Sequence, residues 1–361
     1  MIDSLNLRCP LNNLSFGNVS YNIVREAFNL KIKLNLFPVG NSIDLSAFNK
    51  ITPGLKSFIE ESVYNRNLNV KRNYPFLNIW HINGSEQKIS DYNILYTFHE
   101  SSQPTSQEVN LCNLYDKVFF SSSYSSEIFK SSGLDNCDYS NPGVDEDIST
   151  SNKEYFKDKI HFGLMGKLES RKHTKRIIQL WLKKYGNQSK YQLTCLINNP
   201  FIKQEDFKQE IASILNGKKY FNINFLEFLP HNSQVNDYLN SLDIDLGGLS
   251  GAEGWNLPCF NSCSLGALPI VLNCTAHKDW ADDSNSILVE PDGESEIFDG
   301  KFFRPDSEFN HGIKFEFSEE LFYNSIEKAI SRTKVSKNLN GLKLKEKFKY
   351  KKTLDKILNN V

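Results

Sequence analysis

The 361-residue chain lacks several features that would place it in a class at once. It has no run of about 18 apolar residues, which excludes a transmembrane helix. Its first residues, MIDSLNLRCPLNN, lack the basic patch and the long apolar core of a signal peptide. The net charge of −1 gives no general attraction to nucleic acid or to an anionic membrane surface.

Cysteine is present but does not follow the spacing of a disulfide framework or a metal site. The seven cysteines are an odd number and are scattered, often within apolar runs such as LTCLI. This favours reduced, partly buried thiols in a cytoplasm. Cys259, Cys263, Cys274 and His277 are near neighbours, but their spacing is not a zinc pattern. We therefore expect no metal site. We expect a cytoplasmic protein, with a peripheral membrane position and a phage origin left open.

Alternating strand and helix patterns fill the C-terminal half. Predicted strands lie at 159–166, 191–197, 223–229, 244–249 and 268–273, and predicted helices at 174–186, 204–217, 233–242 and 259–267. Strands that alternate with helices through right-handed crossovers form a parallel sheet with helices on both faces. This half is therefore predicted to be a doubly wound, Rossmann-like α/β domain.

The N-terminal half alternates in a similar way, and the length exceeds what one hydrophobic core usually accommodates. Predicted strands lie at 5–11, 34–39, 77–82, 92–98 and 117–122, and predicted helices at 19–29 and 123–133. A polar stretch at 141–156 marks the boundary. We expect Rossmann-like domains over 1–150 and 151–330, and an amphipathic terminal helix within 331–361. Two such domains facing each other leave a cleft between the carboxyl ends of both sheets.

The segment SGAEGWNLPCFNSCSLGALPIVLNC, at 250–274, sets a carboxylate on a glycine-rich turn before a helix. Proline suits the first turn of that helix, and the free amides and dipole of a helix N-terminus favour anions such as phosphate. Glu253 just before those amides could accept hydrogen bonds from hydroxyl groups. A helix-capping carboxylate beside structural glycines explains the same letters, and both interpretations stay open on the residues alone.

This segment resembles the nucleotide-sugar site of retaining family 4 glycosyltransferases, which have the GT-B fold. Eight positions match the family's pattern in register: Glu253, Gly254, Trp255, Leu257, Pro258, Gly266, Pro269 and Val271. Asn256 replaces a usual glycine, and Asn261 replaces a second glutamate. The resemblance implies that Glu253 contacts donor-sugar hydroxyls and that position 261 contacts the ribose. Residues 253–257 and Asn261 are therefore the expected sugar and ribose site.

A second stretch, GLMGKLESRKHTKR, is similar to the family's G-R-L-x-x-x-K-G segment. Lys167 stands for its arginine, Lys172 matches its lysine, and His173 stands for its glycine. Cations are needed because the leaving diphosphate gains charge as the glycosidic bond breaks. The resemblance implies that Lys167 and Lys172 bind this diphosphate. An exposed basic loop is the alternative.

Four residues of the N-terminal half complete the expected site. Gly17, in the first strand-to-helix turn, is expected near the donor phosphates. His81 ends an apolar run and is the candidate for sugar binding or proton transfer. His99 and Glu100 end another predicted strand and are candidates for acceptor contacts. His277 and Asp279, by contrast, are expected to be surface loop residues.

The resemblance implies a glycosyltransferase that moves a sugar from a nucleoside-diphosphate donor to an acceptor hydroxyl with retention, and without a metal or cofactor. Residues 1–150 would be the acceptor domain and 151–330 the donor domain, with the last helix crossing back to the first. The acceptor could be a glycan, a lipid-linked sugar, a protein or a modified nucleotide. The alternative is an inactive GT-B module that binds without catalysis, because Lys167 and Asn261 depart from the pattern. The oligomeric state is left open.

Overall fold

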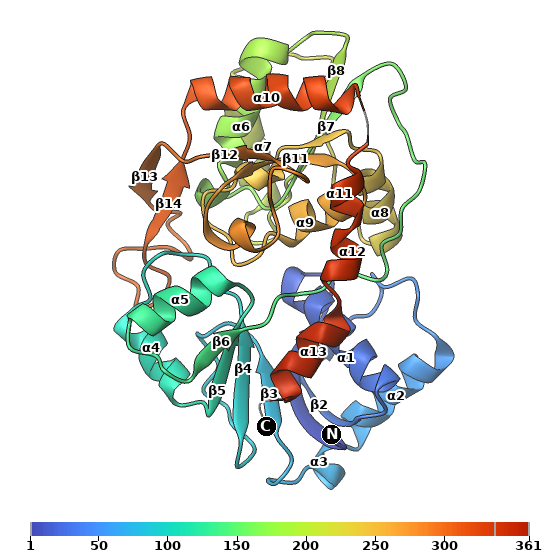
Figure 1. The fold of residues 1–361 in the computed structure, drawn as a ribbon, viewed down its shortest axis with the longest axis vertical. Helices are drawn as coiled ribbons and strands as arrows, with labels where there is room; N and C mark the ends of the chain where they lie inside the picture. The colour runs from blue at the N-terminus through green and yellow to red at the C-terminus, as the bar shows by residue number, and fades with distance from the viewer. Residues whose placement is uncertain (1, 336, 360–361) are drawn as a thin grey trace.

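The computed structural model describes residues 2–335 and 337–359, and it consists of two α/β domains stacked along the long axis (Figure 1). The first domain holds a parallel sheet in the order β2-β1-β3-β4-β5-β6. Its strands are β1 (Ser4–Leu11), β2 (Lys33–Ile43), β3 (Phe76–Ile79), β4 (Asn93–Thr97), β5 (Lys117–Phe120) and β6 (Cys137–Tyr139). Its helices are α1 (Ser15–Asn29), α2 (Pro53–Tyr64), α3 (Arg66–Asn69), α4 (Ser106–Asn113) and α5 (Ser123–Ser131).

The second domain holds another parallel sheet, in the order β12-β11-β10-β7-β8-β9. Its strands are β7 (Ile160–Met165), β8 (Tyr191–Leu196), β9 (Ile223–Phe225), β10 (Ile244–Asp245), β11 (Leu268–Leu272) and β12 (Ile287–Val289). Its helices are α6 (Thr174–Tyr185), α7 (Gln204–Leu215), α8 (Asn232–Asn240), α9 (Leu257–Ser264) and α10 (Glu319–Thr333). A hairpin of β13 (Gly293–Glu296) and β14 (Ile313–Glu316) projects from it. The predicted fold of two Rossmann-like domains is confirmed.

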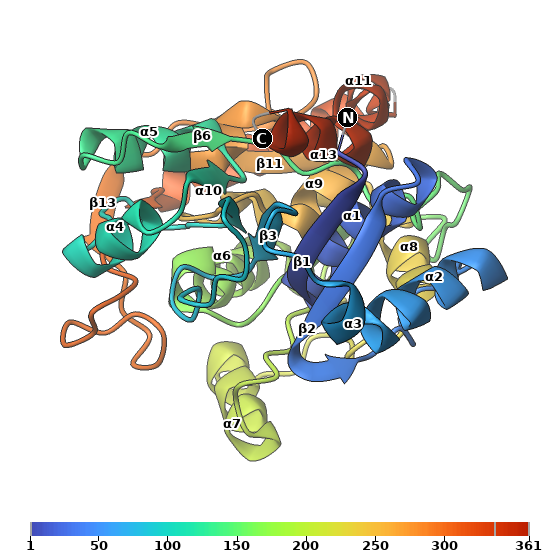
Figure 2. The ribbon, with the colours of Figure 1, turned by 90° about the horizontal axis from the view of Figure 1, so that it is seen from below.

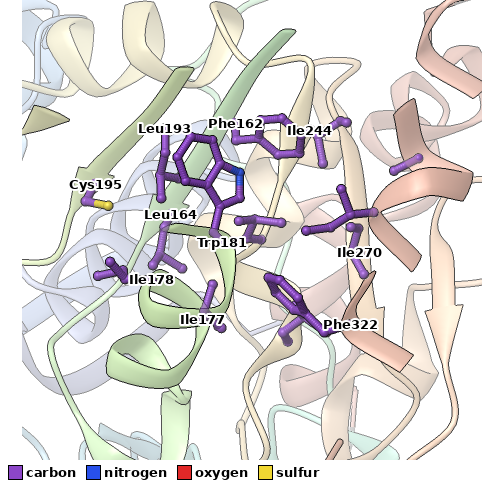
Figure 3. Close-up of a cluster of buried hydrophobic side chains, with 14 of the residues drawn as sticks. Phe162, Leu164, Ile177, Ile178, Trp181, Leu193, Cys195, Ile244, Ile270 and Phe322 are labelled. Atoms are coloured by element: carbon purple, nitrogen blue, oxygen red, sulfur yellow. The ribbon is translucent and has the colours of Figure 1, made fainter. Parts of the chain in front are cut away.

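Each domain has its own core because its parallel strands are covered on both faces. In the second domain, Trp181 points from α6 toward the strands that carry Phe162 and Leu193 (Figure 3). All three side chains are buried, and the rings of Phe162 and Trp181 meet edge to face at 5.8 Å. This explains why strands of parallel sheets have nearly continuous apolar runs.

The end of the chain differs from the predicted single helix. It forms α11 (Leu339–Leu342), α12 (Leu344–Lys347) and α13 (Tyr350–Leu358). The last two are separate because Phe348 is extended, with φ −113° and ψ 105°. α13 lies beside α1, and its Leu354 and Ile357 belong to the core of the first domain (Figures 1 and 2). Positions 336, 360 and 361 of the predicted segment, like position 1, lie outside the described residues.

A loop after β11 fastens the two domains together. Asp279 accepts hydrogen bonds from the Ser123 amide at 2.8 Å and from Asn141 Nδ2 at 2.7 Å. His277 is fully buried, and its Nδ1 lies 2.9 Å from the Leu272 carbonyl oxygen. The prediction that both are surface loop residues is therefore wrong for His277, whereas Asp279 is half-buried against the first domain. A polar loop sequence does not reveal that a neighbouring domain covers it.

We expect Leu354→Ala to lower the free energy of unfolding by about 2–5 kcal/mol, because it leaves a cavity in the core of the first domain. The matched control is Leu339→Ala in α11, where the side chain is 63% exposed, and a change within about 0.5 kcal/mol is expected there. Urea denaturation measures both. Equal, small effects would show that α13 does not dock on this core.

Candidate active site

The candidate site lies where both sheets have a topological switch point. The strand order places one switch between β1 and β3 and the other between β7 and β10. Doubly wound folds bind ligands outside the carboxyl ends of their strands at such points. Loops that follow these four strands line one cleft between the domains, with a cavity volume of about 380 Å³. The topology thus brings together segments that are far apart in the sequence.

Glu253, in the loop after β10, is the centre of a buried ionic cluster. Its carboxylate is paired with Lys172 Nζ and lies 3.2 Å from Arg171 Nη1. Burial raises the pKa of Glu253, but the charges of Lys172 and Arg171 outweigh it and hold the pKa at about 2. The group is therefore ionised at neutral pH. It accepts hydrogen bonds and has no proton to donate.

Arg171 is a site residue that the sequence analysis did not single out. Its guanidinium is buried, lies 3.2 Å from Glu169 Oε2 and donates to the Ala252 carbonyl at 2.6 Å. It also lies 3.7 Å from Glu100 Oε1 of the first domain. Burial lowers the pKa of Arg171, but the three glutamates raise it by a larger amount, so the guanidinium stays charged. In the letters LESRKH nothing separates this buried arginine from an exposed one.

Lys167 lies on the cleft in the loop after β7. Its Nζ is 3.8 Å from Glu169 Oε1 and 5.0 Å from the centre of the Phe201 ring. Burial lowers its pKa, which Glu169 partly opposes. Lys167, Lys172 and the first turn of α9 all line the same cavity. Cations and a helix N-terminus at one place can hold an anion such as a diphosphate.

Two departures from the family pattern have a common backbone cause. Asn256 and His173 replace family glycines, and both adopt left-handed conformations, with φ of 65° and 53°. Asparagine and histidine are among the residues that tolerate this region best. Asn256 also donates to the Gly247 carbonyl at 2.9 Å, which fixes the turn before α9. The two substitutions therefore keep the backbone shape that glycine provides.

The remaining predicted residues of the second domain divide between cleft and core. Gly254 fits closely against the first domain, since a Cβ there would be 3.1 Å from Phe98 Cβ. Trp255 borders the cleft, but its ring is buried and packs edge to face on Phe260 at 5.3 Å. Leu257 and Asn261 line the cleft. Asn261 Oδ1 has no hydrogen-bond partner among the described residues.

The predicted residues of the first domain also divide. His81 lines the cleft with an exposed ring, and the surrounding walls desolvate it and lower its pKa. Glu100 lines the cleft too, whereas His99 is buried beneath it, 3.6 Å from Glu108 Oε2. Gly17 does not border the cavity in the described residues. It is buried against Asn12, where a Cβ would overlap the Asn12 backbone, so Gly17 lets the loop that lines the cavity pack against α1.

Two negative findings hold for residues 2–335 and 337–359. Within these ranges, the histidine, cysteine, aspartate and glutamate side chains form no group of three or more that could hold a metal ion. No helix in the same ranges has the length and apolar character needed to cross a membrane.

Comparisons with known proteins show the fold. No protein-family model matches the chain, and no curated protein matches it. Sucrose-phosphate synthase from Thermosynechococcus elongatus is 9% identical with a TM-score of 0.69, over 99% of this chain and 98% of that one. Anabaena HepE in complex with UDP and glucose is 11% identical with a TM-score of 0.68, over 99% and 98%. At such identities the likeness shows the fold alone, and that fold is GT-B.

The left-handed conformation of Asn256, in the turn before α9, predicts different stabilities for its alanine and glycine variants. Asn256→Ala is expected to be less stable than Asn256→Gly by about 1 kcal/mol, because alanine is strained at this φ and glycine is not. Both variants lose the side-chain hydrogen bonds, so these cancel in the comparison. At Asn113, an exposed helical position of α4, the order should reverse, because alanine is the better helix former. Thermal unfolding measures all four, and the same order at both positions would contradict the assignment.

The ionisation of Glu253 predicts a pH-dependent contribution to stability. Its pKa is lowered from 4.5 to about 2, so the stabilisation is complete above pH 4.5 and is lost as the pH falls toward 2. Glu253→Gln should cost about 3 kcal/mol at neutral pH, and the difference from the wild type should shrink by about 2 kcal/mol between about pH 5 and 3. The exposed Glu227→Gln is the control, in which no such trend is expected. A constant difference for Glu253→Gln would rule out the ionised pair.

Proposed function

We propose that the chain is a glycosyltransferase that moves a sugar from a nucleoside diphosphate to an acceptor hydroxyl. The observation that carries the proposal is the cluster of Glu253, Lys172, Arg171 and Lys167 at the switch point of the second sheet, facing the first domain across the cleft. A structural neighbour, Anabaena HepE, is in complex with UDP-glucose, at 12% identity and a TM-score of 0.66. The family 4 pattern around Glu253 supports the same function.

In the proposed mechanism the donor lies with its diphosphate toward Lys167 and Lys172. The glycosidic bond to the diphosphate breaks, and the two ammonium groups with the amides of α9 stabilise the charge that develops on the leaving oxygen. We propose that these groups take the part that a metal ion plays elsewhere. The negative charge of Glu253 suits it to accept hydrogen bonds from sugar hydroxyls. Asn261 Oδ1, an acceptor without a partner in the described residues, suits a ribose hydroxyl.

On the other side of the cleft, the acceptor oxygen forms the new bond to the anomeric carbon. We propose that His81 binds the sugar or takes up the hydroxyl proton, because its lowered pKa keeps the imidazole neutral near pH 7. Retention of configuration is proposed on the family resemblance, and proton NMR of the anomeric signal of the product tests it. We assign no side chain as a covalent nucleophile.

A panel of nucleotide sugars tests the proposed function. Release of free UDP, GDP or ADP is expected with one donor, and it should persist in EDTA. Lys172→Ala and Glu253→Ala should each lower kcat by about 10²–10³, the range found when one transition-state contact is removed. Lys175→Ala is the matched control, because this exposed lysine of α6 is paired with Glu210 away from the cleft.

Two results would contradict the proposal. Full activity in Glu253→Ala would show that the cluster is not the donor site. No release from any donor, together with no thermal shift with any nucleotide, would favour the alternative function, an inactive GT-B module that binds another ligand. A thermal shift without turnover would show that the nucleotide binds but that transfer fails, and the departures from the family pattern at Asn261 and Lys167 would then be the first residues to test.

A further inference from the structure

The wall of the cleft that belongs to the first domain is aromatic. Phe16, at the start of α1, lies 4.4 Å from the ring of His81, 5.1 Å from Phe98 and 5.8 Å from Trp80, measured between ring centres. All four side chains line the cavity and none is fully buried. Phe16 lies in the first turn of α1, Trp80 and His81 follow β3, and Phe98 follows β4. These four side chains, the aromatic wall, line the same cavity as the ionic cluster of the second domain.

Polar groups without partners accompany these rings. Asn13, in the loop before α1, and Ser15, the first residue of α1, border the same cavity, and their side chains form no hydrogen bond to any described residue. Neither ring nitrogen of His81 has a partner within the described ranges. An amide, a hydroxyl and an imidazole offer both donors and acceptors. A ligand on this wall would therefore contact flat apolar faces with hydrogen-bonding groups beside them.

The charge of the wall limits the ligand further. Among the described lining residues up to 150, the charged ones are Glu100 and Asp145, and both are acidic. The cations of the cavity, Lys167, Arg171 and Lys172, all belong to the second domain. Glu100 lies 3.7 Å from Arg171, so its charge is partly balanced from the second domain, while the described first-domain lining itself supplies no cation to pair with a phosphate or carboxylate of an acceptor.

We propose that the aromatic wall, together with Asn13 and Ser15, is an acceptor subsite for an uncharged sugar ring. A pyranose has one face of C–H groups, which stacks on an aromatic ring, and a rim of hydroxyls, which bind amide, hydroxyl and imidazole groups. This inference rests on the proposed function, since it names the acceptor class of that site. It selects a glycan from the wider set of glycan, lipid-linked sugar, protein and nucleotide.

Saturation-transfer NMR tests this without requiring turnover. The full chain is loaded with whichever of UDP, GDP or ADP gives a thermal shift. It is then mixed with methyl glycosides of glucose, galactose, mannose and N-acetylglucosamine, and separately with methyl glucuronide, glucose 6-phosphate and a serine peptide. Uncharged glycosides should bind, with transfer strongest on the C–H protons of one face. Trp80→Ala and Phe16→Ala should each weaken this binding about tenfold. Phe298→Ala is the control, an exposed ring outside the cavity.

The outcomes separate this inference from the proposed function. The thermal shift with UDP, GDP or ADP is measured first in the wild type and in each variant. If the wild type shows no shift with any of the three, the proposed donor site itself is contradicted. If a nucleotide binds, the inference is overturned by binding of only the charged sugars or the peptide, by no binding of any probe, or by equal glycoside binding in wild type and Trp80→Ala. Selective loss of uncharged glycosides in both aromatic variants, with Phe298→Ala unaffected, supports it.

Discussion

The site depends on one buried interaction, the contact of Arg171 with Glu253, Glu169 and Glu100. Taking charges out of water is costly, and a buried ion pair is stable only when its partners and hydrogen bonds are all in place. Here the guanidinium satisfies carboxylates from both domains and the Ala252 carbonyl at once. It therefore holds Glu253 against the segment that carries Lys167 and Lys172, and its approach to Glu100 adds one contact between the two domains.

Much of the fold could be predicted from the sequence because parallel strands have a strong apolar signal. The strands β1–β5 and β7–β11 and the helices at 174–186 and 204–217 were found within a few residues of their observed bounds, whereas the edge strands β6 and β12 were missed. α2, α3, α4 and α10 were missed, since they lie in stretches where polar residues look like loop. The division of the terminal helix was missed as well, because its apolar spacing continues past Phe348, where the backbone becomes extended.

The residues of the candidate site could be predicted where they lie in a contiguous sequence motif. They could not be predicted where burial or the packing of distant segments brings them to the cleft. Glu253, Lys167 and Lys172 lie in short ordered motifs, so the sequence singles them out, and the structure places all three at the cleft. Arg171 has the same letters as a surface cation, and only burial distinguishes it. Phe16 and Trp80 are 64 positions apart and come together through the strand order, which single-sequence patterns do not specify. Trp255 matches the family motif, yet its ring packs in the core.

The docking of α13 on α1 has a consequence for how the chain is made. Part of the core of the first domain, including Leu354 and Ile357, is supplied by the last helix. On the ribosome, domains generally fold as units with the N-terminal one first. In this chain the face of the first domain that α13 covers stays open until residues 350–358 have been made, which is after the whole second domain. The core of the first domain is thus finished later than that of the second.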